Sequence, residues 1–334
     1  MTFPHARLPG LLSACLATLR RHPALTTAAG AATLLAGTAL INRRRAQKAQ
    51  RDNPPQGRFI EVGGVQLHYL ERGSGRPLVL FHGNGSMIQD FLSSGLIDRA
   101  ADHYRVIVFD RPGFGHSPRP RGVVWTAEAQ ADLFKAALDQ LGVHRAIVLG
   151  HSWGASVAVA LAIRHPPSVG ALVLASGYYF PTARRDVAAS LVPAMPGLGD
   201  VISYTASPIL GRLMWPVMLK TLFGPRLAPR KFAGFPREMA LRPEQMRASA
   251  AEAALMIPGA FSAAKTYREL EIPTIIISGE EDRLIDTDEQ SARLHGEIKQ
   301  SKLRRIAGVG HMIHQSAMPD VMAAIDEAAA QTPH

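Results

Sequence analysis

The stretch AIVLGHSWG, residues 146–154, decides the fold of this 334-residue chain. Its first four residues are a short apolar run, the pattern of a parallel strand buried on both faces. A helix is predicted directly after it, over Trp153–His165. The pattern G-x-S-x-G between a strand and a helix indicates a sharp turn that exposes Ser152 at the top of a sheet. Gly150 and Gly154 fit this interpretation, because such a strained turn leaves no room for a Cβ.

A serine hydroxyl needs a base to take its proton and an acid to orient that base. In this context the acid and then the histidine follow later in the chain, each after a strand. Asp282 follows a predicted strand at Pro273–Ser278, and His311 follows one at Lys302–Ile306. We therefore predict Ser152, Asp282 and His311 as the catalytic residues.

Neighbouring residues leave alternatives open. Glu281 and Asp286 compete with Asp282 for the acid, and His314 competes with His311 for the base. The remaining histidines beside motifs, His116 and His151, are interpreted as structural.

The developing oxyanion needs backbone N–H donors. A predicted strand at Leu78–Phe81 runs into His82-Gly83-Asn84-Gly85, a loop that can turn one amide toward the site. We predict that the amides of Asn84 and Trp153 form the oxyanion hole and that His82 braces the loop.

The rest of the body alternates short strands with helices, which predicts an α/β fold with a mostly parallel sheet and helices on both faces. Further strands are predicted at Arg58–Val62, Val65–Arg72, Tyr104–Phe109 and Gly170–Ala175, the first two as a hairpin through Gly63-Gly64. Further helices are predicted at Asp90–Asp102, Thr126–Leu141, Thr287–Leu294 and Pro319–Ala329.

The interval Tyr178–Leu270 breaks this alternation. It is rich in proline and is far longer than an ordinary connection between a strand and a helix, so we expect an inserted unit of short helices that acts as a lid. Its large apolar residues could line a substrate pocket or form a small core of their own; they are Tyr178, Tyr179, Phe180, Met195, Met214, Trp215, Met218 and Phe223.

The net charge of +10 is confined to the N-terminus. Residues 1–58 hold nine of the 37 basic residues and one of the 27 acidic residues, a net of +8, which leaves +2 for the rest of the chain. A nearly neutral body offers no continuous basic face, so nucleic-acid binding is not expected. The single cysteine, Cys15, excludes an intramolecular disulfide framework and a cysteine metal cluster.

The basic residues flank an unbroken run of Ala, Leu, Thr, Gly and Ile at residues 24–41. About 20 apolar residues span a bilayer, so this run is long enough for a marginal span. Arg43, Arg44 and Arg45 follow it, as basic residues often follow the cytoplasmic end of a span. We expect membrane association through an uncleaved anchor. A cleaved export or targeting peptide, and a packed helix of a cytoplasmic protein, remain alternatives. The polar residues Gln47–Gly57 are expected to form a linker.

Several motifs together closely resemble the α/β-hydrolase fold superfamily, in its lidded subgroup of serine hydrolases. They are Gly73-Ser74-Gly75-Arg76-Pro77, His82-Gly83-Asn84-Gly85, the run from Asp110 to Ser117, Gly150-His151-Ser152-Trp153-Gly154, Asp282 and His311. The resemblance implies an eight-stranded sheet with a helical lid after strand six. It also implies that the loop beginning at Asp110 is structural. The expected units are an N-terminal segment (1–57), a hydrolase core (58–177 and 271–334) and the lid (178–270).

Within this superfamily, epoxide hydrolases and haloalkane dehalogenases use an aspartate where this chain has Ser152, so both activities are disfavoured. We expect a carboxylic-ester hydrolase of apolar small molecules that needs no metal or organic cofactor. A C–C bond hydrolase with the same triad is the alternative, followed by a member that only binds a ligand. The residues that bind substrate and the oligomeric state are left open by the sequence.

Overall fold

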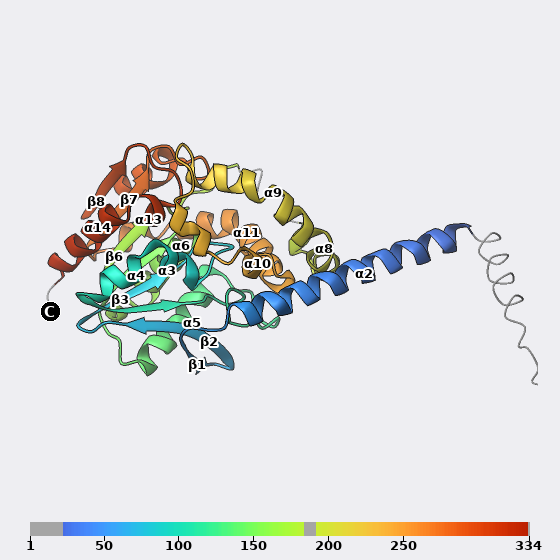
Figure 1. Ribbon diagram of the computed structural model, residues 1–334. Helices are drawn as coiled ribbons and strands as arrows, with labels where there is room; N and C mark the ends of the chain where they lie inside the picture. The colour runs from blue at the N-terminus through green and yellow to red at the C-terminus, as the bar shows by residue number, and fades with distance from the viewer. Residues whose placement is uncertain (1–22, 184–191, 333–334) are drawn as a thin grey trace, which may run out of the picture.

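An eight-stranded sheet lies at the centre of the protein, in the order β1-β2-β4-β3-β5-β6-β7-β8 (Figure 1). The computed structural model describes residues 23–183 and 192–332. The strands are β1 (Arg58–Val62), β2 (Val65–Arg72), β3 (Arg76–Phe81), β4 (Tyr104–Phe109), β5 (Ala146–His151), β6 (Val169–Ala175), β7 (Thr274–Gly279) and β8 (Ser301–Ile306). Strand β2 pairs antiparallel with β1 and β4, and every other pairing is parallel. The predicted mostly parallel sheet is confirmed.

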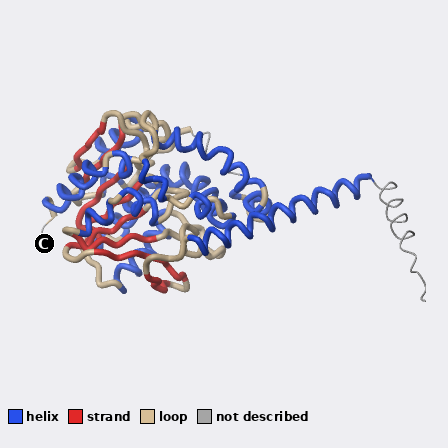
Figure 2. The backbone as a smooth tube through the Cα atoms, viewed as in Figure 1, coloured by secondary structure: helices blue, strands red, loops and turns tan. Residues whose placement is uncertain are grey.

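Helices cover both faces of the sheet, so that strands occupy the middle of the fold (Figure 2). On one face lie α5 (Ala127–Gln140), α6 (Trp153–Arg164) and α12 (Arg293–Glu297), and on the other α3 (Ile88–Ser94), α4 (Leu96–Ala101), α13 (Ile313–Ser316) and α14 (Met318–Ala330). The single helix expected at Asp90–Asp102 is two helices, because Gly95 adopts φ 79° between them. The helix expected at Thr287–Leu294 is a π-helical turn (Asp288–Ala292) that runs into α12.

Helices form most of the described part of the insertion between β6 and β7. They are α8 (Leu198–Tyr204), α9 (Ala206–Phe223), α10 (Arg237–Ala240) and α11 (Pro243–Ala263), with 3-10 turns at Arg230–Gly234 and Tyr267–Glu269. The expectation of short helices was wrong for α9 and α11, which are 18 and 21 residues long. Both continue through an internal proline, Pro216 and Pro258, which removes one backbone hydrogen bond without ending the helix.

The helix α2 (Pro23–Asp52) projects from the body at its N-terminal end and packs against the insertion at its C-terminal end (Figure 1). The expected linker at Gln47–Gly57 is wrong up to Asp52, because Ala, Arg, Lys and Gln are good helix formers and the helix stops before Pro54. Asn42 is buried and its Nδ2 donates hydrogen bonds to the carbonyls of Tyr204 and Thr205 at 3.0 and 2.9 Å. Among the described helices, α2 is the one long and apolar enough to cross a membrane.

A fully buried ion pair joins the insertion to the core. The guanidinium of Arg111, just after β4, contacts both carboxylate oxygens of Glu252 in α11 at 2.5 and 3.0 Å. The same guanidinium donates to the carbonyls of His82 and Gly83 at 2.8 and 3.0 Å. Arg111 therefore fixes the loop after β3 and the insertion with one side chain.

Breaking this ion pair should be costly, because it would leave the charge of Arg111 buried without its partner. We expect Glu252→Ala to lower the free energy of unfolding by about 3–5 kcal/mol. Urea unfolding followed by circular dichroism measures this loss. The matched control is Glu297→Ala, which breaks the exposed Arg268–Glu297 pair and should leave the free energy of unfolding nearly unchanged, because water screens an exposed ion pair. Equal losses in the two variants would show that Arg111 does not depend on Glu252.

Candidate active site

Ser152 occupies a strained turn between β5 and α6. Its backbone has φ 54° and ψ −121°, a conformation that L-residues rarely adopt. The close approach of α6 to β3 holds this turn, because a Cβ on Gly154 would lie 2.2 Å from the carbonyl oxygen of Phe81. Such strain persists only where the surrounding packing enforces it, and it is typical of functional sites.

Asp282 and His311 lie side by side, although 29 residues separate them in the chain. The Nδ1 of His311 is 2.7 Å from Oδ2 of Asp282, and both side chains are almost fully buried. The other carboxylate oxygen of Asp282 accepts hydrogen bonds from the amides of Leu284 and Ile285 at 2.8 and 2.9 Å. The loop after β7 thus fixes the carboxylate in an orientation that directs one oxygen at the imidazole.

The competing residues have other contacts within the described part of the chain. The carboxylate of Glu281 accepts a hydrogen bond from the amide of Val309 at 3.1 Å. Asp286 accepts from the amides of Asp288 and Glu289 at an exposed position. His314 lies against Asp90, with 3.0 Å between Nε2 and Oδ1.

The side chain of His82 supports the loop after β3 through contacts of both ring nitrogens. Its Nδ1 lies 2.8 Å from the carbonyl oxygen of Gly83, and its Nε2 accepts a hydrogen bond from the amide of Arg111 at 3.0 Å. Complete burial, together with the charge of Arg111, lowers the pKa of His82 to about 3. A neutral imidazole with both nitrogens engaged supports the loop, as expected from the sequence.

Asn84 and Trp153 lie on the two elements expected to supply backbone amides. Asn84 follows Gly83 in the loop, and its side-chain Nδ2 donates to the carbonyl of Ser249 in α11 at 3.1 Å. Trp153 is the first residue of α6, where backbone amides have no acceptor within the helix.

Gln245 is a further support of this loop that the sequence analysis missed. Its Oε1 accepts from the amide of Gly115 at 3.1 Å, and its Nε2 donates to the carbonyls of Gly85 and Ser86 at 3.3 and 3.4 Å. No sequence signal marks this residue, because Gln245 belongs to the insertion and reaches the loop only through the tertiary fold.

The loop beginning at Asp110 is held by its buried carboxylate, in agreement with its expected structural role. The carboxylate accepts hydrogen bonds from the amides of Ile88 and His116, both at 2.9 Å, and lies 2.7 Å from Nδ1 of His68. Burial alone would raise the pKa of Asp110, but the contact with His68 outweighs it and lowers the pKa.

Three buried groups near His311 could offer metal ligands. The donor atoms of Asp90, His151 and His314 lie within 4.8 Å of one another. The carboxylate of Asp90 already accepts hydrogen bonds from Ser86 and Gln315 at 2.9 Å and faces His314, so it is engaged without an ion. His151 Nε2 lies 3.1 Å from the carbonyl oxygen of His311, and burial lowers the pKa of His151 well below its usual value. These contacts fit a neutral His151 that supports the backbone of His311.

Ser152, Asn84 and His311 line one cavity of about 440 Å³. The insertion supplies most of its apolar wall, through Met214, Trp215, Val217, Met218, Leu222, Phe232, Phe235 and Met256. Tyr178, Tyr179, Phe180 and Phe223 from the expected lid are instead buried in hydrophobic cores. Among the described residues that line the cavity there is no lysine or arginine. The cavity therefore suits a neutral, apolar molecule.

Comparisons of the sequence with curated proteins give several hydrolases of moderate identity. The 2-hydroxy-6-oxo-2,4-heptadienoate hydrolase of Pseudomonas putida F1 is 28% identical over 78% of this chain and 91% of its own length. The haloalkane dehalogenase 2 of Mycobacterium tuberculosis H37Rv is 26% identical over 82% of this chain and 95% of its own length.

Solved structures show the same fold. An esterase from Thermogutta terrifontis superposes with a TM-score of 0.67 at 21% identity, over 83% of this chain and 100% of its own. A membrane phospholipase A superposes with a TM-score of 0.62 at 23% identity, over 96% of both chains.

A family model described as the alpha/beta hydrolase fold matches residues 76–316, which is most of the chain. This match covers the turn at Ser152, the pair Asp282–His311 and the insertion that closes the cavity. Together with the sheet order and the hydrolases among its relatives, it establishes that the chain belongs to the alpha/beta hydrolase fold family and is a hydrolase.

Proposed function

We propose that this protein is a serine hydrolase that cleaves carboxylic esters of apolar small molecules. The observation that carries the proposal is the placement of Ser152 and His311 in one apolar cavity, with Asp282 hydrogen-bonded behind His311. A strained serine, a histidine and a buried carboxylate in this arrangement are the parts that acyl transfer needs.

The roles follow from the contacts of each residue. Ser152 attacks the ester carbonyl, while His311 takes the hydroxyl proton and returns it to the leaving alcohol. Asp282 holds Nδ1–H of His311 and stabilises the imidazolium that forms. The amides of Asn84 and Trp153 donate to the oxyanion. Water then attacks the acyl-enzyme, with His311 acting again as base, and releases the acid.

C–C bond hydrolysis remains the second candidate activity. Two relatives are hydrolases whose named substrates are carbon chains that carry a carboxylate. They are the 2-hydroxy-6-oxo-2,4-heptadienoate hydrolase and a 2-hydroxymuconate semialdehyde hydrolase from Pseudomonas sp. CF600, at 28% and 29% identity. Binding such an anion in an apolar cavity calls for a cationic partner. The described lining residues offer no lysine or arginine, which favours a neutral ester.

The N-terminal helix α2 supports binding of the protein to a membrane. The apolar half of α2 is unburied, and the exposed Arg43, Arg44 and Arg45 follow it at the level where anionic headgroups would lie. Near the end of α2 that packs against the insertion, α9 exposes Ile209, Leu210 and Leu213. It also exposes Met214 and Val217, which line the cavity at Ser152. We therefore propose that α2 anchors the enzyme and that the apolar side of α9 faces the lipid.

Labelling with a fluorophosphonate tests the nucleophile. The wild-type protein should become covalently labelled, and Ser152→Ala should abolish the label, because it removes the attacking oxygen. The control is Ser156→Ala, one helical turn away, whose hydroxyl donates to the carbonyl of Tyr178 and should be dispensable for labelling. A folded wild-type protein that takes no label would favour a member that only binds a ligand.

A substrate panel separates the two hydrolase activities. We expect kcat/KM for p-nitrophenyl esters to rise from acetate to octanoate by up to about fourfold for each methylene that the cavity buries, because each buried methylene contributes about 0.8 kcal/mol. The dienoate substrate of the Pseudomonas putida relative should not be cleaved measurably. Faster turnover of the dienoate than of every ester would reverse the assignment. The measurement is initial rate against concentration, by absorbance.

Membrane fractionation tests the role of α2. The full-length protein should sediment with membranes after cell lysis and need detergent for release. Deletion of residues 2–40 removes the apolar half of α2 but keeps Asn42, Ala46 and Ala49, which are buried against the body. The variant should therefore be soluble and active on p-nitrophenyl acetate. Recovery of the intact full-length protein in the soluble fraction would contradict the anchor.

A further inference from the structure

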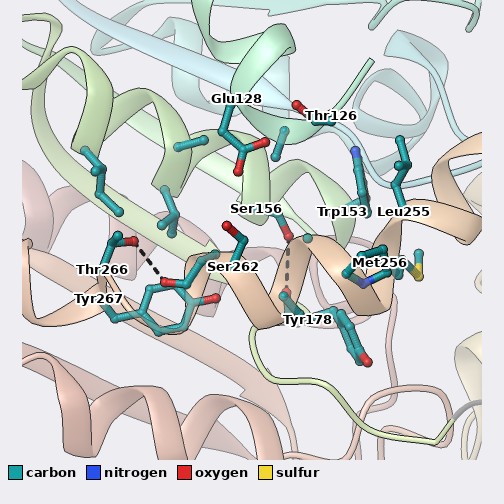
Figure 3. A pocket seen from close by; sticks show the side chains of 18 of the residues that line it. Thr126, Glu128, Trp153, Ser156, Tyr178, Leu255, Met256, Ser262, Thr266 and Tyr267 are labelled. Atoms are coloured by element: carbon teal, nitrogen blue, oxygen red, sulfur yellow. Dashed lines mark hydrogen bonds between the residues drawn. The ribbon is translucent and has the colours of Figure 1, made fainter. Parts of the chain in front are cut away.

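A second cavity, of about 480 Å³, lies beside α6 and shares Met256 with the catalytic cavity (Figure 3). Its walls come from α6, the start of α5, and the second half of α11. Met256 lines both cavities, whereas Trp153, Glu128, Ser262 and Tyr267 line this one alone. Its volume is within the range of about 300–1,000 Å³ that small-molecule sites occupy.

Aromatic residues form part of its wall. Trp153 and Tyr267 are each 2% exposed. The hydroxyl of Tyr267 donates to the carbonyl of Tyr179 at 2.6 Å, which leaves the ring for contact with a ligand. The indole Nε1 of Trp153 is buried and has no hydrogen-bond partner within the described residues. A buried N–H group without an acceptor is unusual in a folded protein, so an acceptor atom of a bound molecule would find a partner there.

Glu128 brings a carboxylate to this apolar space. Figure 3 shows its side chain pointing into the cavity, opposite Ser262 and Tyr267. Within the described chain no hydrogen bond or ion pair engages this carboxylate. Its charge lies close to the phenol of Tyr267, since it adds to the burial that raises the pKa of Tyr267.

The guanidinium of Arg164 is already paired with a carboxylate. Arg164 lines the same cavity, but its guanidinium makes two hydrogen bonds to the carboxylate of Asp132 at 2.7 and 2.8 Å. Glu128 also lies close enough to Arg164 to help raise the pKa of its guanidinium. The carboxylates of Glu128 and Asp132 together exceed this one guanidinium by one negative charge, so the site keeps a net negative charge. A carboxylate in a cavity with aromatic and aliphatic walls complements an ammonium group on an apolar body, because cations are attracted both to carboxylates and to aromatic faces. An anionic ligand such as a fatty acid would be repelled.

We propose that this cavity is a binding site for an amphiphilic amine, separate from the site of ester hydrolysis. The ammonium group lies against Glu128, and the apolar body occupies the space between Trp153, Tyr267 and α11. This inference does not rest on the proposed ester hydrolysis, since the residue that carries the charge preference, Glu128, lines the second cavity and not the cavity at Ser152.

Three matched probes test the charge preference: 3-phenylpropylammonium, 3-phenylpropanol and 3-phenylpropionate. They share one apolar body and differ only in the head group. Calorimetric titration into the full-length protein in neutral detergent, with a blank titration into detergent, should show the ammonium binding about tenfold more tightly than the alcohol, or about 1.4 kcal/mol. Glu128→Gln should remove this preference and leave the affinity for the alcohol unchanged. If instead Glu128 only stabilises the start of α5, the Gln variant would bind the ammonium as the wild type does, and the proposal would fail.

A pair of glycine variants locates the binding. Gly259 lines the cavity, and a Cβ added there would meet no atom within 4 Å, so Gly259→Leu should fill the space without a clash. Gly296 in α12 is equally open but lines neither cavity, which makes Gly296→Leu the control. We expect Gly259→Leu alone to weaken ammonium binding, by tenfold or more. Undiminished binding in a Gly259→Leu variant with a wild-type melting temperature would place the amine elsewhere and overturn the proposal.

Discussion

The turn at Ser152 is the constraint on which the rest of the site depends. Its backbone is held at positive φ because α6 begins in contact with β3, where only glycine fits at position 154. This contact places the serine, the first amide of α6 and the loop after β3 on one edge of the sheet. The same edge receives the loops after β7 and β8 that carry Asp282 and His311, because the strands are parallel.

A second layer of buried polar contacts keeps this edge in place. Arg111 is hydrogen-bonded to the loop after β3 and paired with Glu252, while Gln245 reaches the same loop from α11. The insertion therefore does more than cover the cavity: its helix α11 helps to position the loop that carries Asn84. In an apolar interior each of these contacts is strengthened by the low dielectric, and losing one partner leaves the other unsatisfied.

The insertion also separates two cavities of similar size. The cavity at Ser152 has mostly apolar walls and no lysine or arginine among its described lining residues, whereas the second cavity is lined by the carboxylate of Glu128. Met256, which is unbranched and adaptable, lines both cavities.

The sequence by itself determined the parallel sheet, the position of the strained serine and the pattern of acid and histidine after later strands, since these depend on local patterns of apolar residues and turns. It did not determine the continuity of α9 and α11 through prolines, the contacts of Gln245 and Glu252, or the cavity that Glu128 lines. Those features depend on contacts between residues more than a hundred positions apart, or on a cavity bounded by several elements. Only the tertiary structure decided them, because packing brings together side chains that no local pattern relates.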